Sequence, residues 1–184
     1  MRCFVAVDLN PKLTQKIEWL QKELAGLDTK LIEPENLHFT LKFLGEVDEG
    51  IVNKVKSVLQ SLAANQETFN VNIAGIGAFP SEKFIRVVWI GGPELANLQS
   101  ATNQALSDLF EKEKPTPHLT IARVRSQNHL PEIIEFINRH QQRTYLRRYC
   151  RIRAWHFLRW SFIRKRLVFA KIKIKREAAN PEKD

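Results

Sequence analysis

The chain has 184 residues, 43% of them apolar and 27% charged, and its formal net charge is +9. This composition excludes fibrous and largely disordered proteins, and the length suits one domain or two small lobes. No apolar run is long enough to cross a bilayer and the N-terminus lacks a signal-peptide core, so we expect a cytoplasmic protein without membrane contact. Cys3 and Cys150 lack metal-ligand spacing, so we expect reduced thiols. No cluster of Asp, Glu and His has metal spacing either, and we expect neither a metal nor a cofactor.

The first half of the chain alternates strand and helix patterns. The expected elements are, in order, a strand over residues 2–7, a helix opened by Asn10 and Pro11 that ends near 26, a strand at 30–32, a strand beginning at His38, a helix from Asp48 to 64, and strands at 68–78 and 86–90. Apolar residues recur at helical spacing in both helices, which predicts that each helix buries one side.

The second half of the chain repeats this theme. Its expected elements are a helix from Pro93 to about 112, a strand beginning at His118, a helix from Pro131 to about 140, and strands near 146–160 and 165–175. Because no Pro-, Gly- or Ser-rich linker separates the halves, we expect a single domain over residues 1–176. The polar residues 177–184 are expected to form a frayed tail.

One tetrapeptide pattern occurs in both halves, at residues 38–41 (His-Phe-Thr-Leu) and at residues 118–121 (His-Leu-Thr-Ile). Each copy lies in a run of apolar and β-branched residues that is typical of a strand. Successive strand side chains alternate between faces, so His38 and Thr40 point one way, as do His118 and Thr120, while their apolar neighbours point into the core. Two matched imidazole–hydroxyl pairs indicate one shared active site.

Basic residues gather toward the C-terminus. Residues 139–176 contain 14 Lys or Arg and no Asp or Glu. Alternate positions between Arg151 and Arg159 hold arginines together with Trp155 and Phe157, which would place cations and aromatic rings on one strand face. Such a face can pair with phosphates and stack on unpaired bases, so it is a candidate RNA surface. A soluble sheet edge whose rings pack against another element is the alternative.

Four stretches of the chain match a known family in order and spacing. They are Arg2–Asp8, Asn36–Glu46, Arg86–Trp89 and Pro117–Val124. These stretches, which span roughly two thirds of the chain, closely resemble the RNA 2′,3′-cyclic phosphodiesterases, also called 2′–5′ RNA ligases, of the two-histidine phosphoesterase superfamily.

The resemblance implies both a fold and an activity. The fold would be α+β and bilobal, with two pseudo-symmetric antiparallel sheets flanking a central cleft and helices on the outer faces. The activity would be metal-independent hydrolysis of 2′,3′-cyclic phosphate ends of RNA, tRNA fragments among them, to 2′-phosphates. We expect the enzyme to act as a monomer.

Opening a cyclic phosphodiester needs a base that activates water, an acid that protonates the departing ribose oxygen, and donors that stabilise the charged oxygens. Two histidines can supply the acid and the base near neutral pH. We expect His118 to be the base and His38 the acid, although the residues alone leave the reverse order open. Thr40 and Thr120 would donate hydrogen bonds to the phosphate.

Two cations are candidate phosphate ligands. Lys42 lies two residues after Thr40 and would share its face in a regular strand, and a solvated strand-end lysine is the alternative. Arg123 stands five residues after His118, at the position where relatives contact the phosphate. Regular alternation would turn Arg123 away from His118, so a bulge, a twist or the length of its side chain must bring it back.

The C-terminal third departs from the family. Residues 158–161 keep a Leu-x-x-Ser element, whereas residues 167–170 (Leu-Val-Phe-Ala) replace the Gly-Pro-x-Tyr-like element of relatives. Two other functions therefore stay open beside hydrolysis, namely 2′–5′ ligation of RNA and RNA binding without catalysis. Opening of a cyclic phosphate on a nucleotide is a further variant of the same chemistry.

Overall fold

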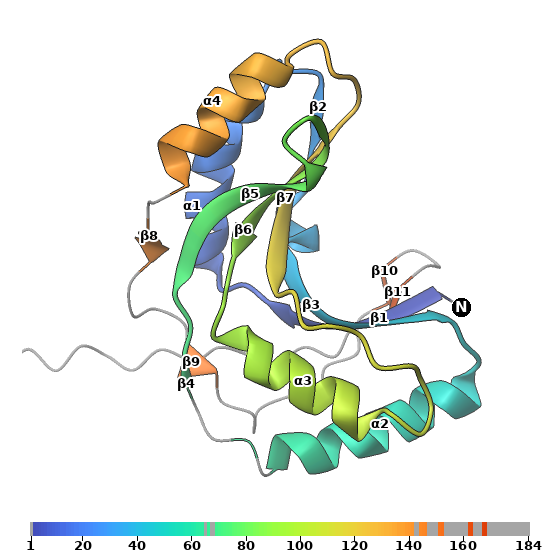
Figure 1. Ribbon diagram of the computed structural model, residues 1–184. Helices are drawn as coiled ribbons and strands as arrows, with labels where there is room; N and C mark the ends of the chain where they lie inside the picture. Colours follow the sequence, from blue (N-terminus) through green and yellow to red (C-terminus); the bar gives the residue numbers. More distant parts are fainter. Residues whose placement is uncertain are drawn as a thin grey trace, which may run out of the picture.

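Antiparallel strands form the centre of the protein (Figure 1). The computed structural model describes residues 2–64, 66 and 69–141, and the strand segments 144–146, 151–152, 162–163 and 167–168. The main sheet contains, in spatial order, β1 (Arg2–Asp8), β3 (His38–Glu46), β7 (His118–Val124), β6 (Phe84–Gly91), β5 (Ile73–Ser81) and β8 (Thr144–Leu146), and β2 (Thr29–Leu31) pairs with β7. All of these pairings are antiparallel.

Helices and short strands complete the described part of the chain. The helices are α1 (Pro11–Gln21), α2 (Glu49–Ala64), α3 (Leu95–Ala105) and α4 (Leu130–His140), with 3-10 turns η1 (Lys22–Leu24) and η2 (Pro34–Asn36). Two further strand pairs are β4 (Phe69–Asn70) with β9 (Arg151–Ile152), and β10 (Phe162–Ile163) with β11 (Leu167–Val168). Among these described helices, none is long and apolar enough to cross a membrane.

All four helices bury their apolar sides in one core with the same face of the sheet. The core contains Leu13 and Ile17 of α1, and Ile133 of α4, together with strand residues such as Val5 and Val88. Asn10 begins α1 by accepting a hydrogen bond from the Leu13 amide (2.9 Å), as an N-cap does. The other face of the sheet is therefore not covered by these helices.

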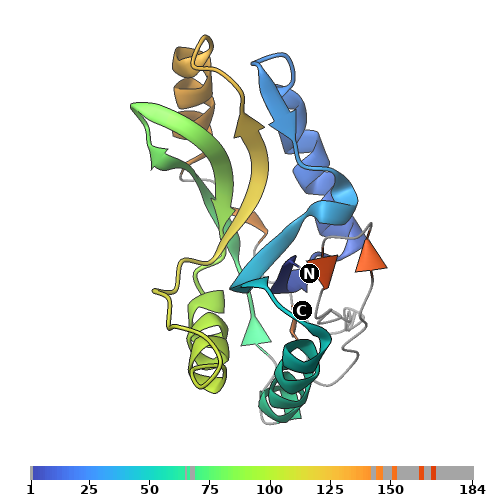
Figure 2. The same ribbon diagram turned by 90° about the vertical axis from the view of Figure 1, so that its right-hand side faces the viewer.

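A single register pair joins the two halves of the sheet. Phe39 of β3 lies opposite Leu119 of β7, and both side chains are buried in the core. Farther along the same edge of β7, β2 takes the place of β3. Figure 2 shows the strands of the two halves diverging from this region.

Gln21 closes the sheet where β2 and β3 part. Its buried side-chain amide donates hydrogen bonds to the carbonyls of Ile32 (2.9 Å) and Ile121 (2.7 Å). The Ile32 amide also donates to the Ile121 carbonyl (3.0 Å), which extends the pairing of β2 with β7. Helix α1 thus supplies a hydrogen-bond donor at the point where β7 passes from its pairing with β3 to its pairing with β2.

A β-bulge interrupts each histidine strand at the same point, three residues after the histidine. In β3 the pairing with β1 skips Leu41, and in β7 the pairing with β6 skips Ile121. Each bulge leaves two consecutive side chains buried instead of one, namely Leu41 with Lys42, and Ile121 with Ala122. Beyond each bulge the alternation is therefore displaced by one residue.

The displacement decides which later side chains share a face with the histidines. Residues that follow the bulges, Phe43 in β3 and Arg123 in β7, are both exposed and lie on the face opposite the core. Phe43 pairs with Phe4 of β1, and the two rings lie 6.1 Å apart between centroids. The same local irregularity thus has the same consequence in both halves.

The structure confirms the expected α+β class of mixed helices and antiparallel strands. The two expected sheets are joined through Phe39 and Leu119, so the strand pairing does not confirm the bilobal division, which stays a prediction. Helix α3 ends at Ala105, earlier than expected, because residues 106–110 continue in turns. The tail 177–184 and most of the basic segment lie outside the described residues.

We expect Gln21→Leu to lower the free energy of unfolding by about 1–3 kcal/mol, because the Ile32 carbonyl loses its donor in a largely buried site. Urea denaturation measures this change. Gln15→Leu, on the exposed side of α1, is the control and should change stability by less than about 0.5 kcal/mol. Equal stabilities of the two variants would contradict the role of Gln21.

Candidate active site at the joint of the two halves

The four motif side chains meet where β3 and β7 are joined. In an antiparallel pair the neighbours of a register pair also lie opposite each other, so His38 lies across from Thr120, and Thr40 across from His118. Because the register pair itself points into the core, the four side chains share the opposite face, which we call the histidine face. The structure therefore brings the two motifs together as the alternation predicted.

Both imidazoles are oriented in the same way. His38 Nδ1 lies 2.7 Å from the carbonyl oxygen of Asn36, and His118 Nδ1 lies 2.7 Å from that of Thr116. A carbonyl oxygen only accepts hydrogen bonds, so Nδ1 carries the proton in each ring. In the neutral form Nε2 then bears the lone pair, which suits a base, and in the charged form it carries a transferable proton.

Aromatic rings fix the two imidazoles from the side. His38 stacks on Phe4 of β1, with centroids 4.7 Å apart and planes 20° apart. His118 meets Phe79 edge-on at 5.0 Å and Trp89 at 6.4 Å. These contacts restrict the rotation of each ring, and sequence patterns gave no signal for them beyond the apolar strand runs.

Burial against Phe4 lowers the pKa of His38 below its ordinary value near 6.5. The hydrogen bond to the Asn36 carbonyl raises the pKa and offsets part of this effect, while repulsion from a charged His118 lowers it further. The repulsion itself requires the two imidazoles to be near each other. Burial and the neighbouring His118 therefore favour the neutral form of His38 in the absence of an anion.

The threonine hydroxyls also lie on the histidine face, and both residues are partly exposed. Neither Thr40 Oγ1 nor Thr120 Oγ1 hydrogen-bonds another residue in the part of the chain that the structure describes. Each hydroxyl can therefore donate to an oxygen of a bound anion without breaking an existing bond.

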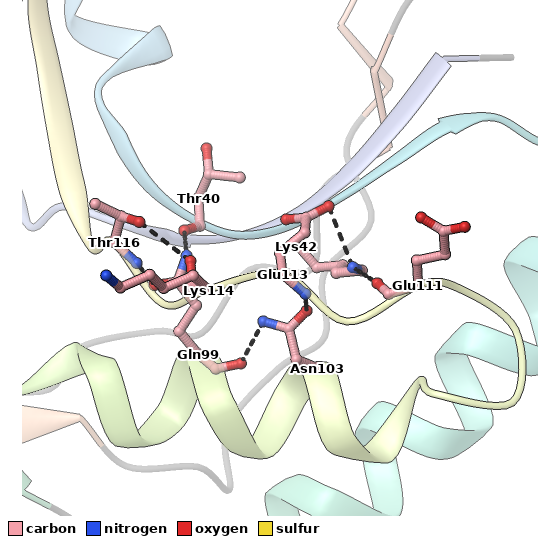
Figure 3. A network of polar contacts seen from close by, with 8 residues as sticks. All are labelled: Thr40, Lys42, Gln99, Asn103, Glu111, Glu113, Lys114 and Thr116. Carbon is pink, nitrogen blue, oxygen red and sulfur yellow. Dashed lines mark hydrogen bonds and ion pairs between the residues drawn. The ribbon is translucent and has the colours of Figure 1, made fainter. Parts of the chain in front are cut away.

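Lys42 does not lie on the histidine face. The bulge at Leu41 turns its side chain toward the core side, where it is only 1% exposed. Its ammonium group donates to the Glu111 carbonyl and lies 3.2 Å from the Glu113 carboxylate (Figure 3). The prediction of a phosphate ligand was wrong, and so was the alternative of a solvated lysine.

Arg123 lies on the histidine face because the bulge at Ile121 displaces the alternation by one residue. Of the three explanations that the sequence left open, the bulge is the one that the strand pairing supports. The side chain of Arg123 is exposed and has no carboxylate partner among the described residues. Arg123 is thus the predicted cation that is available for an anion.

Gln99 of α3 links β3 to the loop that precedes β7. The sequence did not predict this role. Its amide nitrogen donates to the Thr40 carbonyl (3.2 Å), and its amide oxygen accepts from the Thr116 amide (2.8 Å). The carbonyl of Thr116 in turn holds His118 Nδ1. Figure 3 shows the Gln99 side chain rising from α3 between these two backbone segments.

Asn103 and Lys42 fasten the rest of the loop before His118. The Glu113 amide donates to Asn103 Oδ1 (3.3 Å), one helical turn along α3 from Gln99. Together with the contacts of Lys42, these bonds tie residues 111–116 to both α3 and β3 (Figure 3). A polar residue on the buried side of a predicted helix is the one sequence signal that could have revealed Gln99.

Other predicted features do not join this site. No group of three or more His, Cys, Asp or Glu gathers among the described residues. Of the 14 Lys and Arg side chains in the basic segment, only Arg139 lies in the described part of the chain. The backbone at residues 151–152 pairs with β4, which is the described portion of the proposed RNA-binding strand.

Comparisons with known proteins identify relatives of the chain. A family model described as LigT like Phosphoesterase matches residues 7–89, which include the first histidine motif. The RNA 2′,3′-cyclic phosphodiesterase of Methanothermobacter thermautotrophicus is 38% identical over 144 residues, which cover 74% of this chain and 78% of that protein. The enzyme of the same name from Methanocaldococcus jannaschii is 40% identical over 68% of this chain and 72% of its own length.

Solved structures share the fold. The protein TT0787 of Thermus thermophilus superposes with a TM-score of 0.63 and 27% identity, over 68% of this chain and 75% of its own. E. coli LigT complexed with 3′-AMP superposes with a TM-score of 0.55 and 25% identity, over 67% of this chain and 71% of its own.

We expect His118→Asn to raise the pKa of His38, because the substitution removes the repulsion between two imidazolium groups and keeps a polar side chain. A titration of the His38 ring signals by NMR measures the shift. His129→Asn is the control, since His129 lies beside Glu132 at the start of α4. If the pKa of His38 were the same in His118→Asn and in His129→Asn, the rings of His38 and His118 would not be neighbours.

Proposed function

The chain belongs to the LigT-like phosphoesterase family of RNA 2′,3′-cyclic phosphodiesterases, and on this premise we propose that it opens 2′,3′-cyclic phosphates at RNA ends to leave 2′-phosphates. The observation that carries the proposal is the pairing of two equally oriented imidazoles, each with a hydroxyl beside it, on one sheet face. Binding alone does not require two acid–base groups.

The proposed reaction is a displacement at phosphorus by water. Water attacks the phosphorus atom and loses a proton to Nε2 of His118, while the bond from phosphorus to O3′ breaks. His38 donates its Nε2 proton to the departing O3′. The products are a ribose 3′-hydroxyl and a 2′-phosphate, and one proton has moved from the acid to the leaving oxygen and one from water to the base.

The lowered pKa of His38 fits an acid that is charged only when substrate is present. In the unliganded protein burial lowers the pKa and favours the neutral ring, whereas the negative charge of a bound phosphate favours the imidazolium form. Substrate binding would therefore favour protonation of His38, the proposed acid.

The threonine hydroxyls would donate hydrogen bonds to the oxygens of the reacting phosphate. Thr40 and Thr120 lie across the joint from the two histidines, so a phosphate between the imidazoles lies beside both hydroxyls. Arg123 adds a positive charge on the same face. This scheme uses protein side chains for every role, so we propose a reaction without a metal. We also propose that the enzyme acts as a monomer in the cytoplasm.

The experiment is hydrolysis of a short RNA with a 2′,3′-cyclic phosphate end, in the presence of EDTA. We expect activity from the unaltered protein and a loss of about 10²–10⁴-fold in kcat for His38→Ala and for His118→Ala. Analysis of the products separates 2′-phosphate formation from ligation. Persistence of hydrolysis in either variant would contradict the two-histidine mechanism.

A substrate with sulfur in place of O3′ assigns the two roles. A thiolate leaves without being protonated, so His38→Ala should recover most of its lost activity on this substrate, and His118→Ala should not. Recovery by His118→Ala instead would reverse the assignment of acid and base.

Gln99→Leu should lower kcat by roughly tenfold with little change in KM, because the Thr116 amide loses its acceptor and the carbonyl of the same residue orients His118. Gln127→Leu is a matched control, since Gln127 also makes two hydrogen bonds to backbone, with Ile85, at a distance from both motifs. Both variants should lose similar stability. Equal kcat values for the two would mean that Gln99 has a structural role only.

A further inference from the structure

Lys30 lies beside Arg123 on the histidine face. In the pairing of β2 with β7, Lys30 is the register partner of Arg123, and the next pair is Leu31 with Ala122. Ala122 is fully buried in the core, so the pair of cations points to the opposite side. The bulge that brings Arg123 to this face therefore also places it next to a second cation.

The backbone under Lys30 is held at both ends of β2. The Arg125 amide donates to the Asp28 carbonyl (2.9 Å) before the strand, and the Ile32 amide donates to the Ile121 carbonyl (3.0 Å) after it. Gln21 adds the hydrogen bond to the Ile32 carbonyl. The adjacency of the two cations is thus a property of the sheet and not of one side-chain rotamer.

This adjacency is unfavourable for folding. Like charges directly opposite each other on neighbouring strands destabilise a sheet. Among the described residues, the only carboxylate paired with either cation is that of Glu33, 4.0 Å from Lys30, and both of those side chains are about half exposed to water. An anion bound between Lys30 and Arg123 would remove the repulsion.

We propose that Lys30 and Arg123 form a second anion-binding subsite, which takes the phosphodiester on the 5′ side of the terminal nucleotide. This inference rests on the proposed function. An RNA that ends in a cyclic phosphate continues only in the 5′ direction. Thr120 and Arg123 lie opposite Trp89 and Val87 of β6, two strand steps or about 7 Å apart. The subsite would make the enzyme prefer RNA over cyclic mononucleotides.

The test compares two substrates that differ in this phosphate. A dinucleotide with a 2′,3′-cyclic phosphate end contains the 5′ phosphodiester, and a 2′,3′-cyclic mononucleotide lacks it. Lys30→Ala should lower kcat/KM for the dinucleotide by roughly three- to tenfold, mainly through KM, and leave the mononucleotide unchanged. It should also reduce the slope of log KM against log salt for the dinucleotide by about 0.7.

Substrate chemistry and matched variants sharpen the test. A dinucleotide whose linking phosphate is an uncharged methylphosphonate lacks the anion that Lys30 would bind. The unaltered protein and Lys30→Ala should therefore open it with the same low kcat/KM. Lys30→Arg should retain the preference for the dinucleotide. Lys16→Ala, an equal loss of charge on the exposed side of α1, should change neither substrate.

Each outcome has one meaning. An equal loss on both substrates would show that Lys30 supports the reacting site, and no loss on either would show that it binds nothing, so both results would overturn the subsite. If the unaltered protein opened neither substrate, the proposed function would fail first. Binding of an RNA with a 3′-phosphate end, measured by fluorescence polarisation, would then decide whether Lys30→Ala still weakens RNA binding.

Discussion

The candidate active site depends on one antiparallel register pair, Phe39 opposite Leu119. Both side chains are buried in the core, so the strands that carry them cannot slip by one residue without exposing their apolar side. The pair therefore fixes the two histidines and the two threonines on the same face and sets which histidine lies across from which threonine. A site made of residues 80 positions apart in the chain rests on this contact between two core side chains.

The bulges decide which face the later residues of each histidine strand occupy. A bulge places two consecutive residues on the core side, and everything after it changes face. In β7 the extra residue is apolar and its neighbour Ala122 fills the core, so the next residue, Arg123, lies on the histidine face. In β3 the neighbour is Lys42, and the core accepts it only because a carbonyl and a carboxylate meet its ammonium group.

The polar contacts beneath the sheet connect stability to geometry. Gln99 holds the backbone of the first motif and of Thr116, two residues before His118, while Lys42 and Asn103 hold the rest of the loop that leads to His118. Each of these groups is buried or nearly so, and a buried polar group without a partner is costly. The hydrogen bonds that satisfy them are the same bonds that determine the position of the second histidine, so the site is rigid for the reason that the fold is stable.

Local alternation and residue identity were enough to predict the repeated histidine–threonine motif, its placement on strands, the α+β class and the family. It could not determine the faces of Lys42 and Arg123, since a bulge is set by the pairing with a neighbouring strand and leaves no local pattern. It also could not reveal Gln99 or Lys30. Their partners lie 17 and 93 residues away in the chain, and only the tertiary structure brings them together.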